Sequence, residues 1–189
     1  MEDLDKTKHL VNLIAKGDSE AFADFYDFFY LKVYRFSSYF VKSDILIEEI
    51  VSDVFFNIWQ SRKKLQGIKN IEGYLYKATR NRALYYLNHT STNDFVPTDE
   101  LPLGYITNTE TPESIAETKE LEQEITKAVE ELPERCKLIY LMAKEEGMKY
   151  KEIAEILSIS EKTVNAQIVI ALKRIAKALR DHLYFFILC

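Results

Sequence analysis

The chain has 189 residues, of which 47% are hydrophobic and 29% charged, with a formal net charge of −5. This composition is typical of a soluble globular protein, and the length suits one domain or two small ones. Five Gly and four Pro are too few for the tight turns of a β-sandwich or barrel, and no apolar run approaches the roughly 18 residues of a membrane span.

Motifs for catalysis, metal binding or secretion are missing from the sequence. Cys136 and Cys189 are isolated, and His9, His89 and His182 lie in different segments, so we expect no disulfide framework, metal site or catalytic group. No glycine-rich phosphate loop occurs, and the acidic N-terminus has no apolar stretch typical of a signal peptide. We therefore expect a cytoplasmic protein that is not an enzyme and has neither a cofactor nor a small-molecule substrate.

The net charge hides two basic segments. Residues 62–89 carry seven basic side chains and one acidic, and residues 135–189 carry ten and six. Between them, residues 90–134 carry two basic and twelve acidic side chains. Screening limits phosphate attraction to about 8 Å at physiological salt, so local charge decides it and the acidic total does not exclude nucleic acid.

Four helices are predicted in the first half of the chain. Residues 4–14 have helical periodicity that stops at Gly17, and Asp18 is a suitable N-cap for the next helix. That helix carries an apolar stripe at three- and four-residue steps, formed by Phe22, Phe25, Phe29, Val33, Phe36 and Phe40.

A third helix should begin at Ser43 or Asp44 and end before the basic residues 61–65. Gly67 marks a short loop, and residues 71–88 form the fourth helix. The third helix should turn inward Ile47, Ile50, Val51, Val54, Phe55 and Ile58.

Residues 90–113 have no periodicity and contain three of the four prolines, which indicates a linker between two helical modules. Helical periodicity resumes from Ile115 to Leu132, stops at Pro133, and returns in a second helix that carries Leu138, Ile139 and Met142 and ends at Gly147. No segment is a strong strand candidate. The predicted fold is therefore all-α, with two small helical domains joined by a flexible acidic linker.

Residues 149–179 predict a helix-turn-helix. Ile153, Ala154 and Leu157 form the inner face of a short helix, and the turn 158–160 has Ile159 as its apolar residue and Ser160 as the N-cap of a longer helix. That second helix should bury Val164, Ile168, Leu172 and Ile175.

The opposite face of this second helix suits the major groove of DNA. Polar groups near the N-terminus of a recognition helix meet base edges, Asn pairs with adenine, and Ala or Val can touch a thymine methyl. A helical hairpin with a merely solvated outer face is the alternative. Arg174, Lys177 and Arg180 continue the positive surface, and the candidate DNA-reading residues are Ser160, Lys162, Thr163, Asn165, Ala166, Val169 and Lys173.

Several motifs in order make the chain resemble the extracytoplasmic-function sigma factors, the smallest members of the bacterial sigma-70 family. In the second half these are Leu132-Pro133-Glu134, Gly147, YKEIA at 150–154 and ISEKTV at 159–164. In the first half, residues 16–30, 48–59 and 73–84 resemble the N-terminal sigma module. The resemblance implies a promoter-specificity subunit of RNA polymerase, with a region 2 domain at residues 1–92, a linker at 93–113, a region 4 domain at 114–182 and an apolar tail at 183–189.

The resemblance also implies a role for each helix. The helix at 44–60 would grip the coiled coil of the polymerase's largest subunit through Glu49, Asp53, Phe56, Trp59 and Gln60, although Phe56 and Trp59 could instead be part of the hydrophobic core. The helix at 71–88 would open and read the −10 element. A melted strand needs cations for its phosphates and flat groups for its bases, and the candidates are Tyr74, Lys77, Arg80, Asn81, Arg82 and Tyr85.

Tyr76 and Tyr86 belong to the same aromatic set on the fourth helix, of which some rings must be core, and an ordinary amphipathic helix with a basic face is the alternative. The recognition helix would read the −35 element. Two departures from the family pattern stand out: Lys149 replaces the usual Ser or Thr cap, which would cost roughly 1 kcal/mol, and Val169-Ile170 replaces a more polar pair.

The partners implied by the resemblance are core RNA polymerase, promoter DNA and an anti-sigma protein, which is often membrane-bound in this family; the free protein would be a monomer. The acidic linker either mimics nucleic acid in polymerase channels or is a solvated tether. The tail LYFFILC either packs on the last helix or has a regulatory role. A helix-turn-helix regulator that is not a polymerase subunit remains the alternative function.

Overall fold

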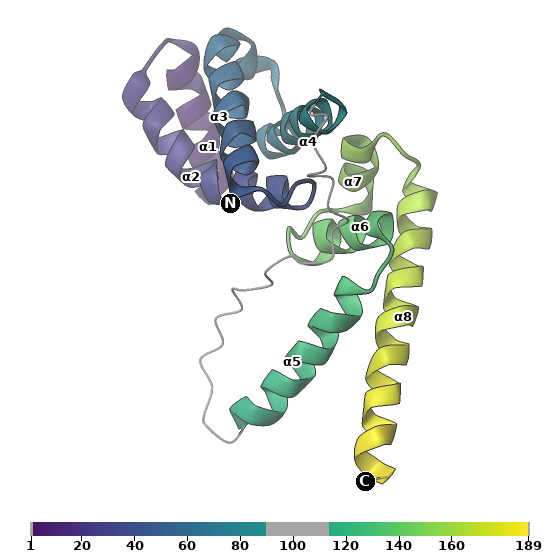
Figure 1. Cartoon of the computed structure of the whole chain (residues 1–189). Coiled ribbons are helices and arrows are strands. Elements are labelled where there is room, and N and C mark those ends of the chain that lie inside the picture. Colours follow the sequence, from purple (N-terminus) through teal and green to yellow (C-terminus); the bar gives the residue numbers. More distant parts are fainter. Residues whose placement is uncertain (1, 90–113, 189) are drawn as a thin grey trace. The chain divides into compact units, whose positions relative to one another are not determined.

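The chain folds into two compact helical units (Figure 1). The computed structural model describes the backbone of residues 2–89 and 114–188, and the side chains of residues 6–89 and 122–180. All regular elements in these ranges are helical, which confirms the predicted all-α class. The first unit holds α1 (Glu2–Ala15), α2 (Ser19–Ser38), α3 (Asp44–Gln60), the 3₁₀ helix η1 (Arg62–Gly67) and α4 (Ile71–His89). The second holds α5 (Ser114–Glu130), α6 (Glu134–Lys144), α7 (Tyr150–Leu157) and α8 (Glu161–Leu188).

Helix α2 packs against three other helices of the first unit, α1, α3 and α4. Its start is fixed locally: Gly17 has φ +94°, and Asp18 Oδ1 accepts hydrogen bonds from the N–H groups of Glu20 and Ala21, both at 3.0 Å. The apolar stripe predicted for this helix lies in the hydrophobic core, with Phe22 and Phe40 half-buried at its edge. All six residues predicted to face inward on α3 are buried.

The segment between α3 and α4 is more ordered than the sequence indicates. Where a basic helix end and a short loop were predicted, α3 ends at Gln60 and the chain makes the 3₁₀ helix η1. Leu65 is fully buried and η1 packs against α1. Such a short element with three residues per turn gives too few positions for a periodic signal, so the apolar anchor could not be recognised in the sequence.

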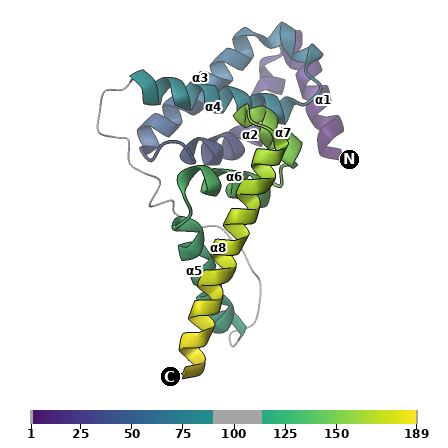
Figure 2. The ribbon, with the colours of Figure 1, turned by 90° about the vertical axis from the view of Figure 1, so that its right-hand side faces the viewer.

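In the second unit α5, α6 and α7 each pack against α8. Figure 2 shows α8 as a long helix that extends beyond its contacts with α6 and α7. The turn after α6 contains Gly147 at φ +62°, and the turn after α7 has Ser158 in the left-handed region at φ +56°. These two turns bring α6, α7 and the start of α8 around Ile139, Met142, Ile153 and Val164, which are all fully buried.

The predicted inner faces of α7 and α8 need two corrections. Leu172 is 45% exposed and Ala171 is fully buried in its place. Both positions lie three or four residues from Ile168 and Ile175, so periodicity allowed either, and hydrophobicity wrongly favoured leucine. On α7 Ile156 is buried, whereas Leu157 is only half-buried.

Two predicted segments cannot be compared with the structure. The linker at 93–113 lies outside the described residues, as do the side chains of the tail at 183–189, although the backbone of α8 runs through Leu188. Within the part of the chain that is described, no helix combines the length and apolar character needed to cross a bilayer.

Candidate nucleic-acid and partner interfaces

The turn between α7 and α8 has the local bonds of a helix-turn-helix. The Ile159 N–H donates to the Ala154 carbonyl at 3.0 Å and closes α7. Ser160 Oγ accepts from the Thr163 N–H at 3.0 Å and lies 2.7 Å from Thr163 Oγ1, which confirms the predicted N-cap. Ile159 is half-buried, as a plug between two helices should be. The first turn of α8 is thereby fixed in orientation.

The N-cap residue of helix α7 does not cap the helix with its own side chain. Lys149 occupies the N-cap position, and its side chain has no oxygen to accept a backbone N–H. The Glu152 carboxylate instead accepts from the Lys149 N–H at 3.0 Å, which supplies one of the two bonds of a capping box.

The outer face of α8 has the character predicted for a DNA-reading helix. Of its predicted base-reading residues only Thr163 is half-buried, and the others are exposed: Ser160, Lys162, Asn165, Ala166, Val169 and Lys173. Arg174, Lys177 and Arg180 are exposed farther along, and so is Ile170, which lies beside Ala166 and Lys173 on this face. The helix therefore presents cations, one amide and small apolar groups together.

Helix α4 divides its aromatic side chains between the hydrophobic core and the surface. Tyr76 is buried, with its ring centroid 4.7 Å from that of Phe36, which bears out the expectation that some rings are core. Tyr74 and Tyr85 are exposed, and Lys77, Asn81 and the half-buried Arg80 lie between them along the helix. The exposed face thus combines flat rings, cations and one amide.

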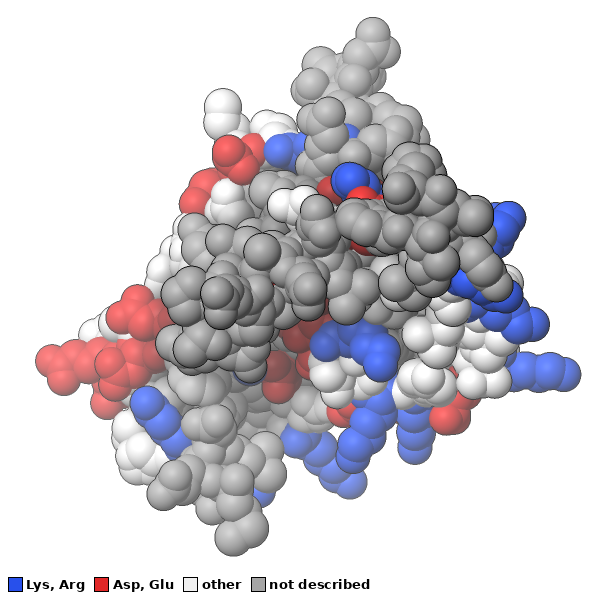
Figure 3. All heavy atoms as spheres, turned by 90° about the horizontal axis from the view of Figure 1, so that it is seen from below, with Lys and Arg blue, Asp and Glu red and all other residues white. Residues whose placement is uncertain are grey.

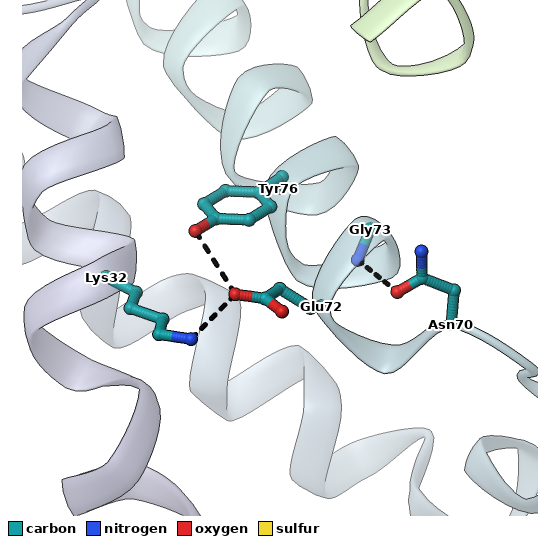
Figure 4. Close-up of polar contacts among 5 residues, drawn as sticks. All are labelled: Lys32, Asn70, Glu72, Gly73 and Tyr76. Carbon is teal, nitrogen blue, oxygen red and sulfur yellow. Dashed lines mark hydrogen bonds and ion pairs between the residues drawn. The ribbon is translucent and has the colours of Figure 1, made fainter. Parts of the chain in front are cut away.

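The N-terminal end of α4 is attached to α2 through one carboxylate (Figure 4). Glu72 Oε1 accepts a hydrogen bond from Lys32 Nζ at 2.8 Å and from the Tyr76 hydroxyl at 3.5 Å. Just before this point Asn70 Oδ1 accepts from the Gly73 N–H at 2.9 Å and caps the helix. Beside this junction, a cavity of about 590 Å³ lies among α1, α2, η1 and the first residues of α4.

A second carboxylate attaches the C-terminal half of α4 to α3. Nε and Nη2 of Arg82 both donate to Asp53 Oδ2, and the Tyr86 hydroxyl donates to the same oxygen at 2.7 Å. Burial and the hydrogen bond to Asp53 raise the pKa of Tyr86. From the sequence, Asp53 was predicted to contact the polymerase and Arg82 to contact DNA, whereas the structure brings the two side chains together.

The other α3 residues predicted to contact polymerase differ in exposure. Glu49, Phe56 and Gln60 are exposed, and Phe56 with 57% of its surface open to solvent is an unusual position for a phenyl ring. Trp59 is half-buried, since its ring lies 4.9 Å from that of Phe22 and 4.7 Å from the Arg62 guanidinium carbon. Phe56 is therefore the stronger candidate for a partner contact.

A tyrosine ladder along α2 was missed in the sequence. Tyr26, Tyr30 and Tyr34 recur every four residues, with neighbouring ring centroids 5.4 Å and 5.9 Å apart. The Tyr30 hydroxyl donates to Glu48 at 2.6 Å, and this hydrogen bond together with burial raises the pKa of Tyr30 to about 12. The four-residue spacing was visible, but nothing in the sequence paired these rings with the acidic residues of α3.

On the face drawn in Figure 3, lysine and arginine side chains project in groups with few acidic side chains among them. Among the described side chains, no group of His, Cys, Asp or Glu is arranged to hold a metal ion.

Family models match both units. The model for sigma-70 region 2 matches residues 25–92, and that for sigma-70 region 4 matches residues 122–175, so together they cover nearly two thirds of the chain. The ECF RNA polymerase sigma-E factor of Escherichia coli K12 is 25% identical over 166 residues, which are 84% of this chain and 86% of that protein. The protein of the same name in Haemophilus influenzae is 26% identical over 166 residues, 84% of this chain and 87% of its own.

Two solved structures share the fold. One is that of CnrH in complex with the cytosolic domain of CnrY, with a TM-score of 0.61 and 14% identity over 93% of this chain and 98% of that one. The other is the sigma factor RpoE from Bartonella quintana in complex with the anti-sigma factor NepR, with a TM-score of 0.58 and 16% identity over 83% and 97%. The succession of helices found here therefore recurs in chains of very different sequence.

Proposed function

Because the chain belongs to the sigma-70 family of RNA polymerase subunits, as a member of its extracytoplasmic-function group, we infer that it binds core RNA polymerase and directs promoter-specific initiation. This family is a class of specificity subunits and not of enzymes. Its region 2 and region 4 models match in the family's order, one in each unit, which favours a polymerase subunit over a regulator that carries only a helix-turn-helix.

The observation that carries this function is that one chain has two helices whose exposed side chains suit different nucleic-acid targets. Helix α8 follows a helix-turn-helix and exposes groups suited to base edges in a duplex. Helix α4 exposes rings and cations suited to a single strand. A protein that reads a duplex at one site and an unpaired strand at another has the chemistry that promoter opening needs.

At the −10 element, we propose that Lys77 and Arg80 of α4 bind strand phosphates. Tyr74 and Tyr85 would stack on bases that have left the duplex, and Asn81 would hydrogen-bond to one of them. All but Arg80 are exposed, and Arg80 is half-buried. Arg82 contributes differently, because its guanidinium is held by Asp53.

At the −35 element, we propose that α8 enters the major groove with Ser160, Lys162, Thr163 and Asn165 nearest the base edges. Ala166 and Val169 would contact thymine methyl groups, and Lys173 would bind a phosphate. The Ser160–Thr163 bonds hold the first turn in the conformation that presents Lys162 and Asn165 outward.

For core polymerase, we propose a contact surface on α3 with Phe56 at its centre and Glu49 and Gln60 beside it. An exposed ring surrounded by polar groups is typical of an interface hot spot. Trp59 would support Phe56 from the half-buried side of the helix. Both promoter elements would then be bound by modules held on one polymerase, which raises the effective concentration of each module at its site.

The division of the chain follows this assignment. We propose a region 2 domain at residues 1–92, a linker at 93–113, a region 4 domain at 114–182 and a separate tail at 183–189. The two neighbours of known structure were solved with the cytosolic domain of CnrY and with the anti-sigma factor NepR. We propose that an anti-sigma protein also binds this chain. We further propose that the protein acts in the cytoplasm and that it is a monomer when free of its partners.

Run-off transcription with purified core polymerase tests the function. Core polymerase alone should give no specific transcript from genomic fragments, and addition of this protein should give transcripts with fixed start sites. A protein that binds promoter fragments but produces no start site with any core polymerase would instead be a helix-turn-helix regulator.

A further inference from the structure

The C-terminal half of α4 depends on one carboxylate of another helix for its orientation. Asp53 Oδ2 accepts hydrogen bonds from Nε and Nη2 of Arg82 and from the Tyr86 hydroxyl, so a single oxygen of α3 holds two side chains four residues apart on α4. The side chains of Asp53 and Arg82 are only 28% and 32% exposed. In this setting a charged hydrogen bond is stronger than on an open surface.

Besides its bond to Asp53, Arg82 contacts an exposed ring. Its guanidinium carbon lies 4.9 Å from the centroid of Tyr85 and 5.0 Å from that of Tyr86. Tyr85 is 47% exposed, and its ring also lies near that of Tyr86, at a centroid distance of 5.9 Å, and stacks on that of His89, at 4.2 Å. Arg82 therefore lies between the carboxylate that fixes it and a ring that is open to solvent.

We propose that Asp53 is a positioning residue for the −10 element: through Arg82 it holds Tyr85 in the orientation that stacks on an unpaired base. This rests on the proposed function of α4. It reassigns Asp53 from the polymerase interface to a partly buried contact between α3 and α4, and Arg82 from a phosphate contact to the link between Asp53 and Tyr85. It also connects α3, which carries Phe56, to the aromatic face of α4.

Simple electrostatics predicts the opposite effect of removing this carboxylate. Loss of the negative charge that faces α4, the helix that carries Lys77, Arg80 and Arg82, would strengthen phosphate binding, because less negative charge opposes the strand. A positioning role predicts weaker strand binding, since Arg82 and the ring beside it lose their fixed orientation. The sign of the change in affinity therefore separates the two readings.

The test measures Asp53→Asn in the assembled polymerase. The probe is a fluorescent single-stranded oligonucleotide carrying the non-template −10 sequence of a promoter identified by run-off transcription. We expect Asp53→Asn to weaken binding of the oligonucleotide about tenfold, while the affinity of the protein for core polymerase changes less than twofold. The slope of affinity against salt should stay unchanged, because no phosphate contact is removed.

Glu48→Gln is the matched control. Glu48 is another carboxylate of α3 that accepts a tyrosine hydroxyl, but its partner Tyr30 is on α2. This substitution should leave both affinities unchanged. A change like that of Asp53→Asn would show that any loss of charge on α3 has this effect and would overturn the proposal.

Tyr85→Ala completes the test through a double-mutant cycle. If Asp53 acts through Tyr85, Asp53→Asn should weaken strand binding less than twofold in the Tyr85→Ala background. Full additivity would overturn the proposal, as would a loss of core polymerase affinity in Asp53→Asn equal to its loss of strand binding.

If Asp53→Asn unfolds the first unit, Arg82→Gln is the alternative variant, because it breaks the same link from the side of α4. A smaller slope of oligonucleotide affinity against salt in Arg82→Gln would show that Arg82 contacts a phosphate, and this would overturn the proposal. A wild-type protein that fails to join core polymerase would overturn the proposed function itself.

Discussion

Replacement of Phe56 by alanine measures what one exposed ring contributes to polymerase binding. A buried phenylalanine covers roughly 150–250 Å², and 57% of Phe56 is open to solvent, which leaves about 100 Å² for a partner to cover. At about 25 cal/mol per Å² this area is worth about 2.5 kcal/mol, or a weakening of binding by about sixtyfold. Fluorescence anisotropy with labelled core polymerase would measure the change.

Stability should be nearly unaffected by Phe56→Ala, because the ring contributes little to the hydrophobic core. Leu31→Ala is the matched control: Leu31 is 74% exposed, and it lies on α2, outside the proposed contact surface on α3. It should bind core polymerase as the wild type does. A weakening by less than threefold for Phe56→Ala, or an equal effect of Leu31→Ala, would refute the placement of the interface.

Three further predictions concern packing, phosphate contacts and pH. Ile168→Ala should destabilise the second unit by roughly 2–5 kcal/mol and Leu172→Ala by less than about 1 kcal/mol, because only the first side chain is buried. Thermal unfolding followed by circular dichroism measures both losses of stability, and a larger loss in Leu172→Ala would contradict this assignment. Lys173→Gln should lower the slope of log affinity for duplex −35 DNA against log salt by about 0.9, and an unchanged slope would exclude a phosphate contact. The pKa of Tyr30 is raised from 10.0 to about 12, so its bond to Glu48 stabilises the fold fully below pH 10 and is lost as the pH rises through about 12. Between pH 9 and pH 11.5 the free energy of unfolding, measured with denaturant, should fall less in Tyr30→Phe than in the wild type. Equal decreases would argue against this bond.

The parts of the fold that were predictable depend on neighbours in sequence. The caps at Asp18 and Ser160 bond to backbone groups two or three residues away, so a suitable residue at a helix start is enough to recognise them. The inward faces of α2 and α3 were predictable for the same reason, because helical periodicity alone determines which residues share a face. Where two adjacent positions satisfied the same period, as at Ala171 and Leu172, this information was insufficient.

The parts that were not predictable depend on residues distant in sequence. Arg82 and Asp53 are 29 positions apart, and the sequence shows each only as a polar residue outside an apolar stripe. Two exposed polar faces on adjacent helices were therefore assigned to two external partners. Only the packing of α4 on α3 shows that the side chains satisfy each other. The same applies to Trp59, whose partial burial depends on contact with Phe22 of another helix.

The position of Trp59 has a practical consequence for spectroscopy. It is the only tryptophan in the chain, and it lies in the first unit, between the Phe22 ring and the Arg62 guanidinium. Indole emission excited at long wavelength therefore reports on the first unit alone, while helical ellipticity reports on both. Comparison of the two signals during denaturation would show whether the halves of this protein melt together or one after the other, without any added dye.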